Sequence, residues 1–272
     1  DTLRAARMPA EAIARERARF HLDRSLPELS RIWLAGLARV DLGNSFRFDR
    51  PVRSLILERA PRTLALVSSA LLLAVAGGIA WGTLIILGRP ITRAVLSGAA
   101  TVLLSLPSIV VLFVFMLVAV RAGWLAQGLH TAVIPALGIA ALLLPAAAGL
   151  ARLHEEGLDQ ALAQPWAIAA MARGVSRRIL IWKLAMRLAA TRVASVLPLL
   201  AANVFGASLL VEVVTGWAGL GRLMLDALVA RDIFLVAGCT AAIAAAVAAL
   251  AVVSDVIVAA LDPRVDVQEA GR

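Results

Sequence analysis

The sequence predicts an all-α protein that crosses a membrane several times, and three features indicate this fold class. The chain has 272 residues, 61% of them hydrophobic, and a mean hydropathy of +0.88. Soluble domains are about 45–50% apolar. The net charge is +9, and the basic residues lie between long uncharged stretches. A nucleic-acid-binding protein of this charge would carry its basic residues on one soluble domain, so that function is not expected.

Five stretches of the chain contain no Asp, Glu, Lys or Arg: 63–88, 94–120, 122–151, 193–211 and 233–254. A membrane-spanning helix needs roughly 20 mostly apolar residues, and each stretch has about that length. A buried helix of a soluble protein rarely runs so far without a charge. The sequence therefore predicts five transmembrane helices.

The regions outside these stretches divide the chain further. Residues 1–62 hold 13 Arg and 8 acidic residues, which predicts a polar segment with short amphipathic helices. One such helix is expected at residues 7–22, where Ala14, Ala18 and Leu22 are spaced by four. The transmembrane domain is expected over 63–261, and residues 262–272 form a C-terminal tail.

The basic residues of the short loops predict the orientation. Five spans put the N-terminal segment and the 152–192 loop on opposite sides. The loops on the side of 152–192 contain 11 basic residues and the opposite loops contain three. The 11 are Arg89, Arg93, Arg152, Arg173, Arg177, Arg178, Lys183, Arg187, Arg192, Arg264 and Arg272, and the three are Arg121, Arg222 and Arg231. The positive-inside rule therefore makes 152–192 and 262–272 cytoplasmic.

The same rule places 1–62 and 212–232 outside the cytoplasm. The 13 Arg of the N-terminal segment favour the reverse orientation, but long polar segments weigh less in this rule. An external N-terminus without a visible secretory signal needs a preceding helix. We therefore expect one further span before Asp1 in the native protein.

The sequence offers no support for an enzyme. The only lysine, Lys183, lies in IWKLA and not in a phosphate-binding G-x-x-x-x-G-K-[ST] loop. The metalloprotease, paired-cysteine and nucleophile-elbow motifs are absent, and Cys239 is the only cysteine. HEEG, His154 to Gly157, is expected to be a solvated helix end rather than a metal or acid–base site. No cofactor and no metal are expected.

The predicted spans are almost free of ionisable groups. Glu212 closes the fourth span and Asp255 lies near the end of the fifth. Both are expected to lie near an interface or to pair with Arg rather than to carry protons. Energy for transport would then come from another subunit. Ser105, Asn203 and Ser208 are candidates for lining a path, although helix–helix contacts are the better explanation for each.

The loop segment AIAAMARGVSRRILIWKL, residues 167–184, has a helical pattern between two apolar stretches. Its apolar side chains Ile168, Met171, Val175, Ile179 and Trp182 predict one continuous apolar stripe. Small alanines keep the first turns slim, and a glycine provides a point where the helix ends or bends. Two interpretations stay open, an interfacial helix and a docking helix for a cytoplasmic partner.

Several motifs in this order resemble the permease subunits of ABC importers, in the dipeptide, oligopeptide and nickel branch. Ala169-Ala170 followed by Gly174 resembles the "EAA…G" loop that docks on the ATPase. The further matches are DLGNS (41–45), RAPRTLAL (59–66), Ser-Leu-Pro (105–107), VEVVTGWAGLGRLMLDALVARD (211–232) and SDVIVAALDPRV (254–265). Together they cover nearly the whole chain.

The chain also departs from the family pattern. Ile168 replaces the acidic residue of the EAA loop, and the proline that follows in the family is absent around Leu184 and Met186. Ala218 stands in the place of the proline of the family's external PGLG motif. The family begins with a transmembrane helix before the DLG segment, in agreement with the expected further span.

The resemblance implies the fold of a type I importer permease, with five spans in this chain. It also implies a second permease subunit, expected to be a different chain, two cytoplasmic ATPases, an extracytoplasmic solute-binding protein and surrounding membrane lipid. The expected location is the inner membrane of a bacterium. The solutes would be peptides or similar small molecules. An ion-coupled transporter or channel is the alternative, and a membrane anchor or receptor is a third.

The resemblance implies site residues at two places. The residues expected to dock the ATPase are Trp166, Ile168, Ala169, Ala170, Met171, Arg173, Gly174, Arg177 and Arg178. The residues expected to face the binding protein are Glu212, Gly216, Trp217, Gly219, Gly221 and Asp232.

Overall fold

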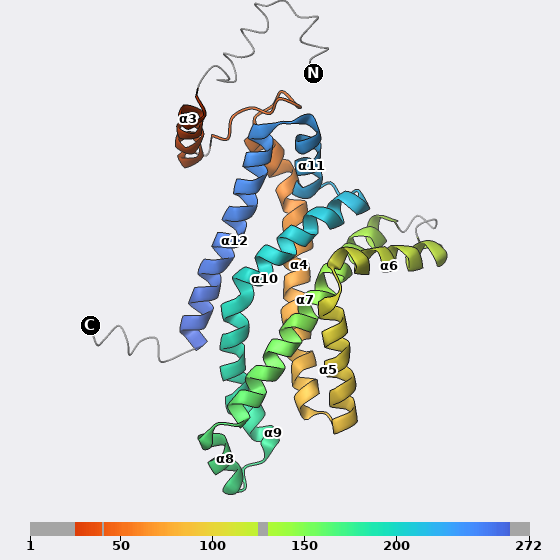
Figure 1. Cartoon of the computed structure of the whole chain (residues 1–272), viewed down its shortest axis with the longest axis vertical. Helices are drawn as coiled ribbons and strands as arrows, with labels where there is room; N and C mark the ends of the chain where they lie inside the picture. Colours follow the sequence, from red (N-terminus) through yellow and green to blue (C-terminus); the bar gives the residue numbers. More distant parts are fainter. Residues whose placement is uncertain (1–24, 40, 125–129, 262–272) are drawn as a thin grey trace, which may run out of the picture.

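The computed structural model describes residues 25–39, 41–124 and 130–261, and this part of the chain is helical without a β-sheet. Four long apolar helices run along the molecule (Figure 1): α4 (Val52–Leu87), α7 (His130–Leu162), α10 (Met186–Thr215) and α12 (Ile233–Leu261). Each is long and apolar enough to cross a membrane. The expected helix at 7–22 and the tail 262–272 lie outside the described residues.

The long helices extend beyond the uncharged stretches. Helix α4 begins at Val52, so the last residues of the predicted polar segment are its first turns. Helix α7 continues through Arg152 to Leu162. The charges mark where the apolar part of a span ends, whereas the backbone hydrogen bonds of the helix continue past that point.

The second predicted span, 94–120, is wrong as a single straight helix. Helices α5 (Pro90–Ser105) and α6 (Ser108–Arg121) meet at 101°. Leu106 between them is extended, with φ −89° and ψ 125°, because a residue before proline is pushed out of the helical region, and Pro107 has no N–H to donate. Helix α5 lies along the bundle and α6 projects sideways from it (Figure 1). The pair is one broken span or a re-entrant segment.

The centre of the bundle depends on glycines that let α4 and α7 approach closely. A Cβ atom added at Gly78 would lie 2.6 Å from the Cβ atom of Leu150, and one added at Gly82 would lie 2.6 Å from the carbonyl oxygen of Ala151. Small residues allow this approach in membrane helices, where packing and hydrogen bonds replace the hydrophobic effect. The surrounding core includes Leu66, Val67, Leu112, Leu142 and Phe205.

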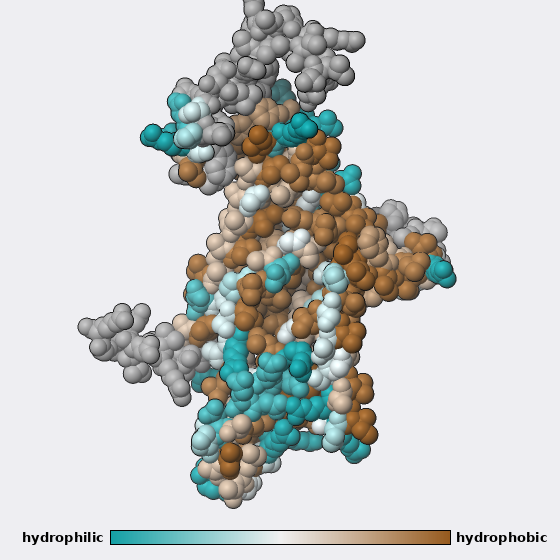
Figure 2. Space-filling view, viewed as in Figure 1, coloured by the Kyte–Doolittle hydropathy of each residue, from teal (hydrophilic) through white to brown (hydrophobic). Residues whose placement is uncertain are grey.

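The surface differs between the ends of the bundle. Figure 2 shows hydrophobic surface over the upper and middle parts, and hydrophilic surface gathered over the lower ends of α7 and α10. Large apolar side chains of the spans, such as Leu72, Leu199 and Val252, are exposed. A lipid-facing surface is expected to have this character.

Candidate functional sites at the two ends of the bundle

One candidate site is the segment between α7 and α10, at the lower end of Figure 1. It contains α8 (Pro165–Ala172), α9 (Arg177–Leu180) and a π-helical turn, η1 (Ile181–Ala185), which runs directly into α10. Proline begins α8 because its fixed φ suits the first helical position, where its missing N–H is not needed. The result is a short helix that lies between α7 and α10 in the chain.

Helix α8 is terminated by Gly174, whose backbone adopts a left-handed conformation that favours glycine. Gly174 has φ +87°, and its N–H donates to the carbonyl oxygen of Met171 at 2.9 Å, while the N–H of Val175 donates to that of Ala170 at 3.1 Å. This pair of hydrogen bonds is a Schellman motif. Open space surrounds the position of a Cβ atom at Gly174, so the requirement is for the backbone angle alone. The expectation that Gly174 ends the helix is confirmed.

The predicted continuous apolar stripe is wrong. The break at Gly174 and the new start at Ser176, whose Oγ accepts from the N–H of Ile179, change the direction of the chain. Ile168, Met171, Ile179 and Trp182 are exposed as a result. The side chains that face the protein are instead Ala167, Ala170, Leu180 and Ile181. The last three belong to one buried cluster with Leu158, Ala161, Leu162 and Ile86. The four exposed side chains therefore lie on two separate helical segments and do not form one continuous stripe.

The residues expected to dock an ATPase divide into two groups. The exposed ones are Ile168, Ala169, Met171, Arg173, Gly174, Arg177 and Arg178. Trp166 is partly buried, and Ala170 is buried in the core of the protein itself. Ala170 is therefore not accessible to another protein in this conformation. We call the exposed group the α8 surface.

The other candidate site lies at the opposite end, where α11 (Leu220–Ala230) joins α10 to α12 (Figure 1). Glu212 is fully buried there. Its carboxylate accepts from the Thr63 hydroxyl at 2.6 Å and from the Gly221 N–H at 2.6 Å. Thr63 Oγ1 in turn accepts from the Leu220 N–H at 2.7 Å. These contacts satisfy N–H groups of the first turn of α11, which have no partner within the helix.

The close approach to Glu212 explains two glycines of the external motif. A Cβ atom at Gly219 would lie 2.5 Å from both carboxylate oxygens of Glu212, and one at Gly221 would lie 2.6 Å from the Cα atom of Leu209. Any larger residue at either position would displace backbone or break the hydrogen bonds of the carboxylate. The Gly-Leu-Gly spacing is therefore a packing requirement.

A second buried carboxylate ties the N-terminal segment to the same end. Asp232 accepts from the N–H of Leu235 at 3.1 Å, near the start of α12. It also accepts from Ser45 Oγ at 2.5 Å and from the Arg47 N–H at 3.0 Å. The DLGNS motif and the final Asp of the external motif are thus parts of one contact. We call the contacts of Glu212 and Asp232 the outer clamp.

The outer clamp corrects the prediction for this region. Glu212, Asp232, Gly219 and Gly221 are buried and do not face a partner. Glu212 pairs with a hydroxyl and a backbone N–H rather than with an arginine. Gly216 is exposed and Trp217 is partly buried, with its Nε1 donating to the carbonyl oxygen of Arg62 at 3.3 Å.

Sequence reasoning missed Thr63 and Ser45, the partners of the two carboxylates. Both lie within quoted motifs, but nothing in the sequence links Thr63 with Glu212, which is 149 residues away. The exposed face that remains on α11 carries Arg222, Leu225, Leu228 and Val229.

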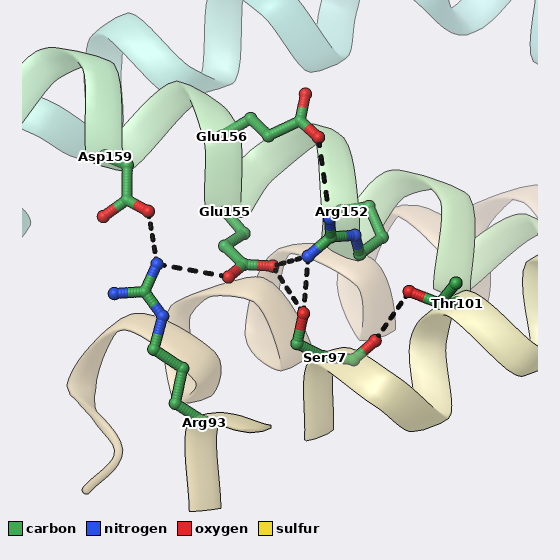
Figure 3. A network of polar contacts seen from close by, with 7 residues as sticks. All are labelled: Arg93, Ser97, Thr101, Arg152, Glu155, Glu156 and Asp159. Atoms are coloured by element: carbon green, nitrogen blue, oxygen red, sulfur yellow. Dashed lines mark hydrogen bonds and ion pairs between the residues drawn. The ribbon is translucent and has the colours of Figure 1, made fainter. Parts of the chain in front are cut away.

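A third polar cluster joins α5 to α7 near the lower end of the bundle (Figure 3). Glu155 accepts from Arg152 at 2.6 Å and from Arg93 at 3.3 Å, and Arg93 also pairs with Asp159. Ser97 of α5 donates to the same carboxylate at 3.4 Å. The cluster is an ion-pair network that joins the two helices.

HEEG is not the solvated helix end that the sequence predicts. His154 and Glu155 are buried, and His154 Nε2 lies 3.2 Å from Thr83 Oγ1 of α4. Helix α7 continues past this motif, and of its four residues only Glu156 is exposed. Among the described residues, no three His, Cys, Asp or Glu side chains are grouped as metal ligands would be.

The three polar residues proposed to line a path differ in exposure. Ser105 and Asn203 are exposed, and Ser105 Oγ donates to the carbonyl oxygen of Thr101 at 2.9 Å. Ser208 is fully buried and donates to the carbonyl oxygen of Phe205 at 2.8 Å. The Ser208 side chain is therefore buried within the helix bundle and does not lie on a surface.

A bundle of long apolar helices with polar structures at its two ends defines a multi-pass membrane protein. Residues 70–267 match the family described as "Binding-protein-dependent transport system inner membrane component". The chain belongs to this family. Its members are permease subunits of ABC importers, in which ATP hydrolysis resides in separate subunits. The expectation of a transport subunit that is not itself an enzyme is confirmed by the family.

Two relatives illustrate the match in sequence. The chain is 28% identical over 263 residues to an oligopeptide transport system permease protein, OppB, of Haemophilus influenzae, covering 94% of this chain and 86% of the relative. It is 27% identical over 252 residues to the corresponding protein AppB of Bacillus subtilis, covering 86% of this chain and 78% of the relative. These names agree with the resemblance to the peptide branch.

Solved structures support the fold. The chain resembles a subunit of the MetNI methionine ABC transporter in an inward-facing conformation, with a TM-score of 0.61 and 20% identity over 76% of this chain and 96% of that one. It also resembles an amino acid ABC transporter crystallised with histidines, with a TM-score of 0.63 and 17% identity over 75% and 92%. The predicted importer permease fold is confirmed.

Proposed function

We propose that the chain is one of two permease subunits of a bacterial inner-membrane importer for peptides or similar small solutes. Two cytoplasmic ATPases power this importer, and an extracytoplasmic binding protein delivers the solute. The names of the relatives support the peptide class. The observation that carries the docking part is the α8 surface, an exposed apolar and basic face on a short helix outside the spans.

The α8 surface has the composition of a protein interface. Ile168 is 56% exposed and Met171 is 37% exposed, and Arg173, Arg177 and Arg178, which follow them in the sequence, are also exposed. An exposed apolar patch rimmed by polar residues marks an interaction site. Arginine also adds donors that suit acidic groups on a partner. An ATPase groove would bury the apolar side chains that the fold leaves uncovered.

The attachment of α8 supports a coupling role. Ala170 shares a buried cluster with Leu158 of α7 and Ala189 of α10, and η1 joins this segment to α10 without a loop. A displacement of α8 would therefore move two long helices. A π-helical turn is a frequent feature of functional segments, and it lies here where α10 begins.

The end of the bundle opposite α8 is the side that we assign to the extracytoplasmic space. The outer clamp fixes α11 and residues 41–51 at the end opposite α8 (Figure 1). The count of basic residues in short loops makes the α8 end cytoplasmic. A solute-binding protein would then contact the exposed face of α11 and the N-terminal segment, and the buried carboxylates would keep that surface in place.

Met171→Glu tests the docking role, because it puts a charge on the α8 surface at a side chain outside the buried cluster. Co-purification with the ATPase is expected to fall at least tenfold, since burial of an unpaired charge costs several kcal/mol, and uptake of labelled peptides is expected to stop. Leu225→Glu on α11 is the matched control at the opposite end, with 36% exposure against 37% for Met171. It should leave ATPase binding unchanged. Normal ATPase binding and uptake by Met171→Glu would make α8 an interfacial helix only.

A further inference from the structure

A groove of about 530 Å³ lies between α7, the start of α8, α10 and α12, beside the α8 surface but not part of it. Its size falls in the range of small-molecule sites, about 300–1,000 Å³. Polar side chains along it include Gln160, Gln164, Arg192 and Ser195. Figure 2 shows hydrophilic surface over the lower ends of α7 and α10, the two helices that supply most of the groove.

The groove carries a positive charge that no carboxylate in it neutralises. Arg192 donates to Gln160 Oε1, a neutral acceptor. None of the described residues that line the groove is acidic. Glu156 and Asp159, on the same helix as Gln160, pair with Arg152 and Arg93. The guanidinium, the amide N–H groups of Gln160 and those of Gln164 are therefore donors suited to an anion.

The other side of the groove is apolar. Trp166, Leu188 and Val258 line it, and Leu188 is 47% exposed. The ligand that fits is amphipathic, with an anionic group against Arg192 and an apolar part along α10 and α12.

The position along the spans corresponds to a membrane interface. Arg192 directly precedes the uncharged stretch 193–211. Ser254 Oγ donates to the carbonyl oxygen of Ala194 at 2.5 Å, which ties α12 to α10 about one turn from Val258. Arginine at the end of an apolar stretch lies at headgroup level.

We propose that this groove binds the phosphate-bearing headgroup of an anionic phospholipid. Basic pockets between transmembrane helices on the cytoplasmic side bind such headgroups. The phosphate accepts from Arg192 and the glutamine amides, and the acyl chains follow Val258 and the apolar surface of α12. Because Trp166 of α8 is part of the wall, an occupied groove stabilises the position of α8 relative to α10. The inference depends on the membrane location and not on ATPase docking.

The test is a titration of the full chain, delipidated in detergent, with dioctanoyl phosphatidylglycerol, dioctanoyl phosphatidylcholine and inorganic phosphate. Native mass spectrometry counts the bound molecules. Arg192→Gln is expected to weaken phosphatidylglycerol binding about tenfold or more, because it removes a charge-assisted hydrogen bond. Ser195→Trp fills the groove without changing its charge and is expected to weaken binding similarly. Arg192→Lys keeps the charge and should retain most of the affinity.

Arg178→Gln is the matched control, the same substitution at an exposed arginine outside the groove. It should change the affinity less than about twofold, as expected for a screened surface charge. Equal binding of phosphatidylcholine by the unaltered protein would overturn the proposal. Unchanged phosphatidylglycerol binding by both Arg192→Gln and Ser195→Trp would do the same. Competition by inorganic phosphate at the concentrations at which phosphatidylglycerol binds would assign the groove to a free anion instead of a lipid.

Discussion

The two ends of the bundle are stabilised by different physical means. At the outer end, two buried carboxylates accept backbone and hydroxyl hydrogen bonds and fix the starts of α11 and α12. At the α8 end, a short helix rests on the spans through alanines and a few apolar side chains, and it is bounded by a glycine with positive φ and by a π-helical turn. Buried hydrogen-bonded networks resist displacement. We therefore expect the outer end to be the fixed part of the bundle and the α8 end to be the part that transmits movement.

The largest expected effect is at Glu212. Glu212→Ala leaves the Thr63 hydroxyl and the Gly221 N–H without their acceptor, and each buried unsatisfied group costs about 1–3 kcal/mol. The apparent free energy of unfolding, from a titration with sodium dodecyl sulfate, should therefore fall by about 2–6 kcal/mol. Protease cleavage within 216–232 should become faster. Glu212→Gln keeps an acceptor and should lose less. Equal stability of Glu212→Ala and the parent would show that the outer clamp is not a major contact.

The next effect is at the contact between Ser45 and Asp232. Each single alanine substitution removes the same hydrogen bond, so the double substitution should be less destabilising than the sum of the singles. The expected coupling in a double-mutant cycle is about 1–2 kcal/mol. Unfolding titrations of the four proteins measure it. Additive effects would mean that the N-terminal segment is held by other contacts.

A smaller and local effect is expected at Gly174. Gly174→Ala forces a residue with a Cβ atom into φ +87°, which costs about 1–2 kcal/mol. The last turn of α8 should fray. The backbone amides of residues 174 and 175 should therefore exchange hydrogen faster in Gly174→Ala than in the parent protein. Global unfolding should stay near that of the parent. Gly174→Asn is the control, since asparagine adopts the left-handed region more readily. If these amides exchange hydrogen at the same rate in Gly174→Ala and in the parent, the Schellman motif does not require glycine at this position.

The smallest effect is expected at the surface pair of Arg50 and Glu58. Both side chains are about half exposed, and exposed ion pairs contribute little because water and salt screen them. Glu58→Gln should leave the melting temperature and the protease sensitivity unchanged. A clear loss of stability would show that the outer end depends on its surface charges as well as on the buried outer clamp.

The sequence predicted the long apolar spans and the end of a helix at Gly174, because composition and a single special residue determine these features locally. The bend between α5 and α6 was missed, although Pro107 was visible, because a proline within a long apolar stretch is often tolerated in a span. The apolar stripe through 168–182 was wrong because a helical pattern was extended across the glycine that ends the helix.

The buried contacts at the outer end could not be predicted from the sequence. Glu212 and Asp232 are charged residues next to a loop that the sequence predicts to be external, so exposure is the expectation from the sequence. Their burial depends on Thr63 and Ser45, which are 149 and 187 residues away in the chain. HEEG was misjudged for the same reason, since its partner Thr83 lies in another helix. Long-range hydrogen bonds of this kind leave no periodic pattern.

The most direct measurement is cross-linking from the α8 surface to the ATPase in intact membranes. In a Cys239→Ala background, Ala169→Cys puts a thiol on the exposed face of α8, and Leu228→Cys puts one on α11. A bifunctional reagent should join Ala169→Cys, and not Leu228→Cys, to the ATPase. A membrane-impermeant thiol reagent added to whole cells should label Leu228→Cys alone. Cross-linking of the ATPase to Leu228→Cys, or labelling of Ala169→Cys from outside the cell, would contradict the account.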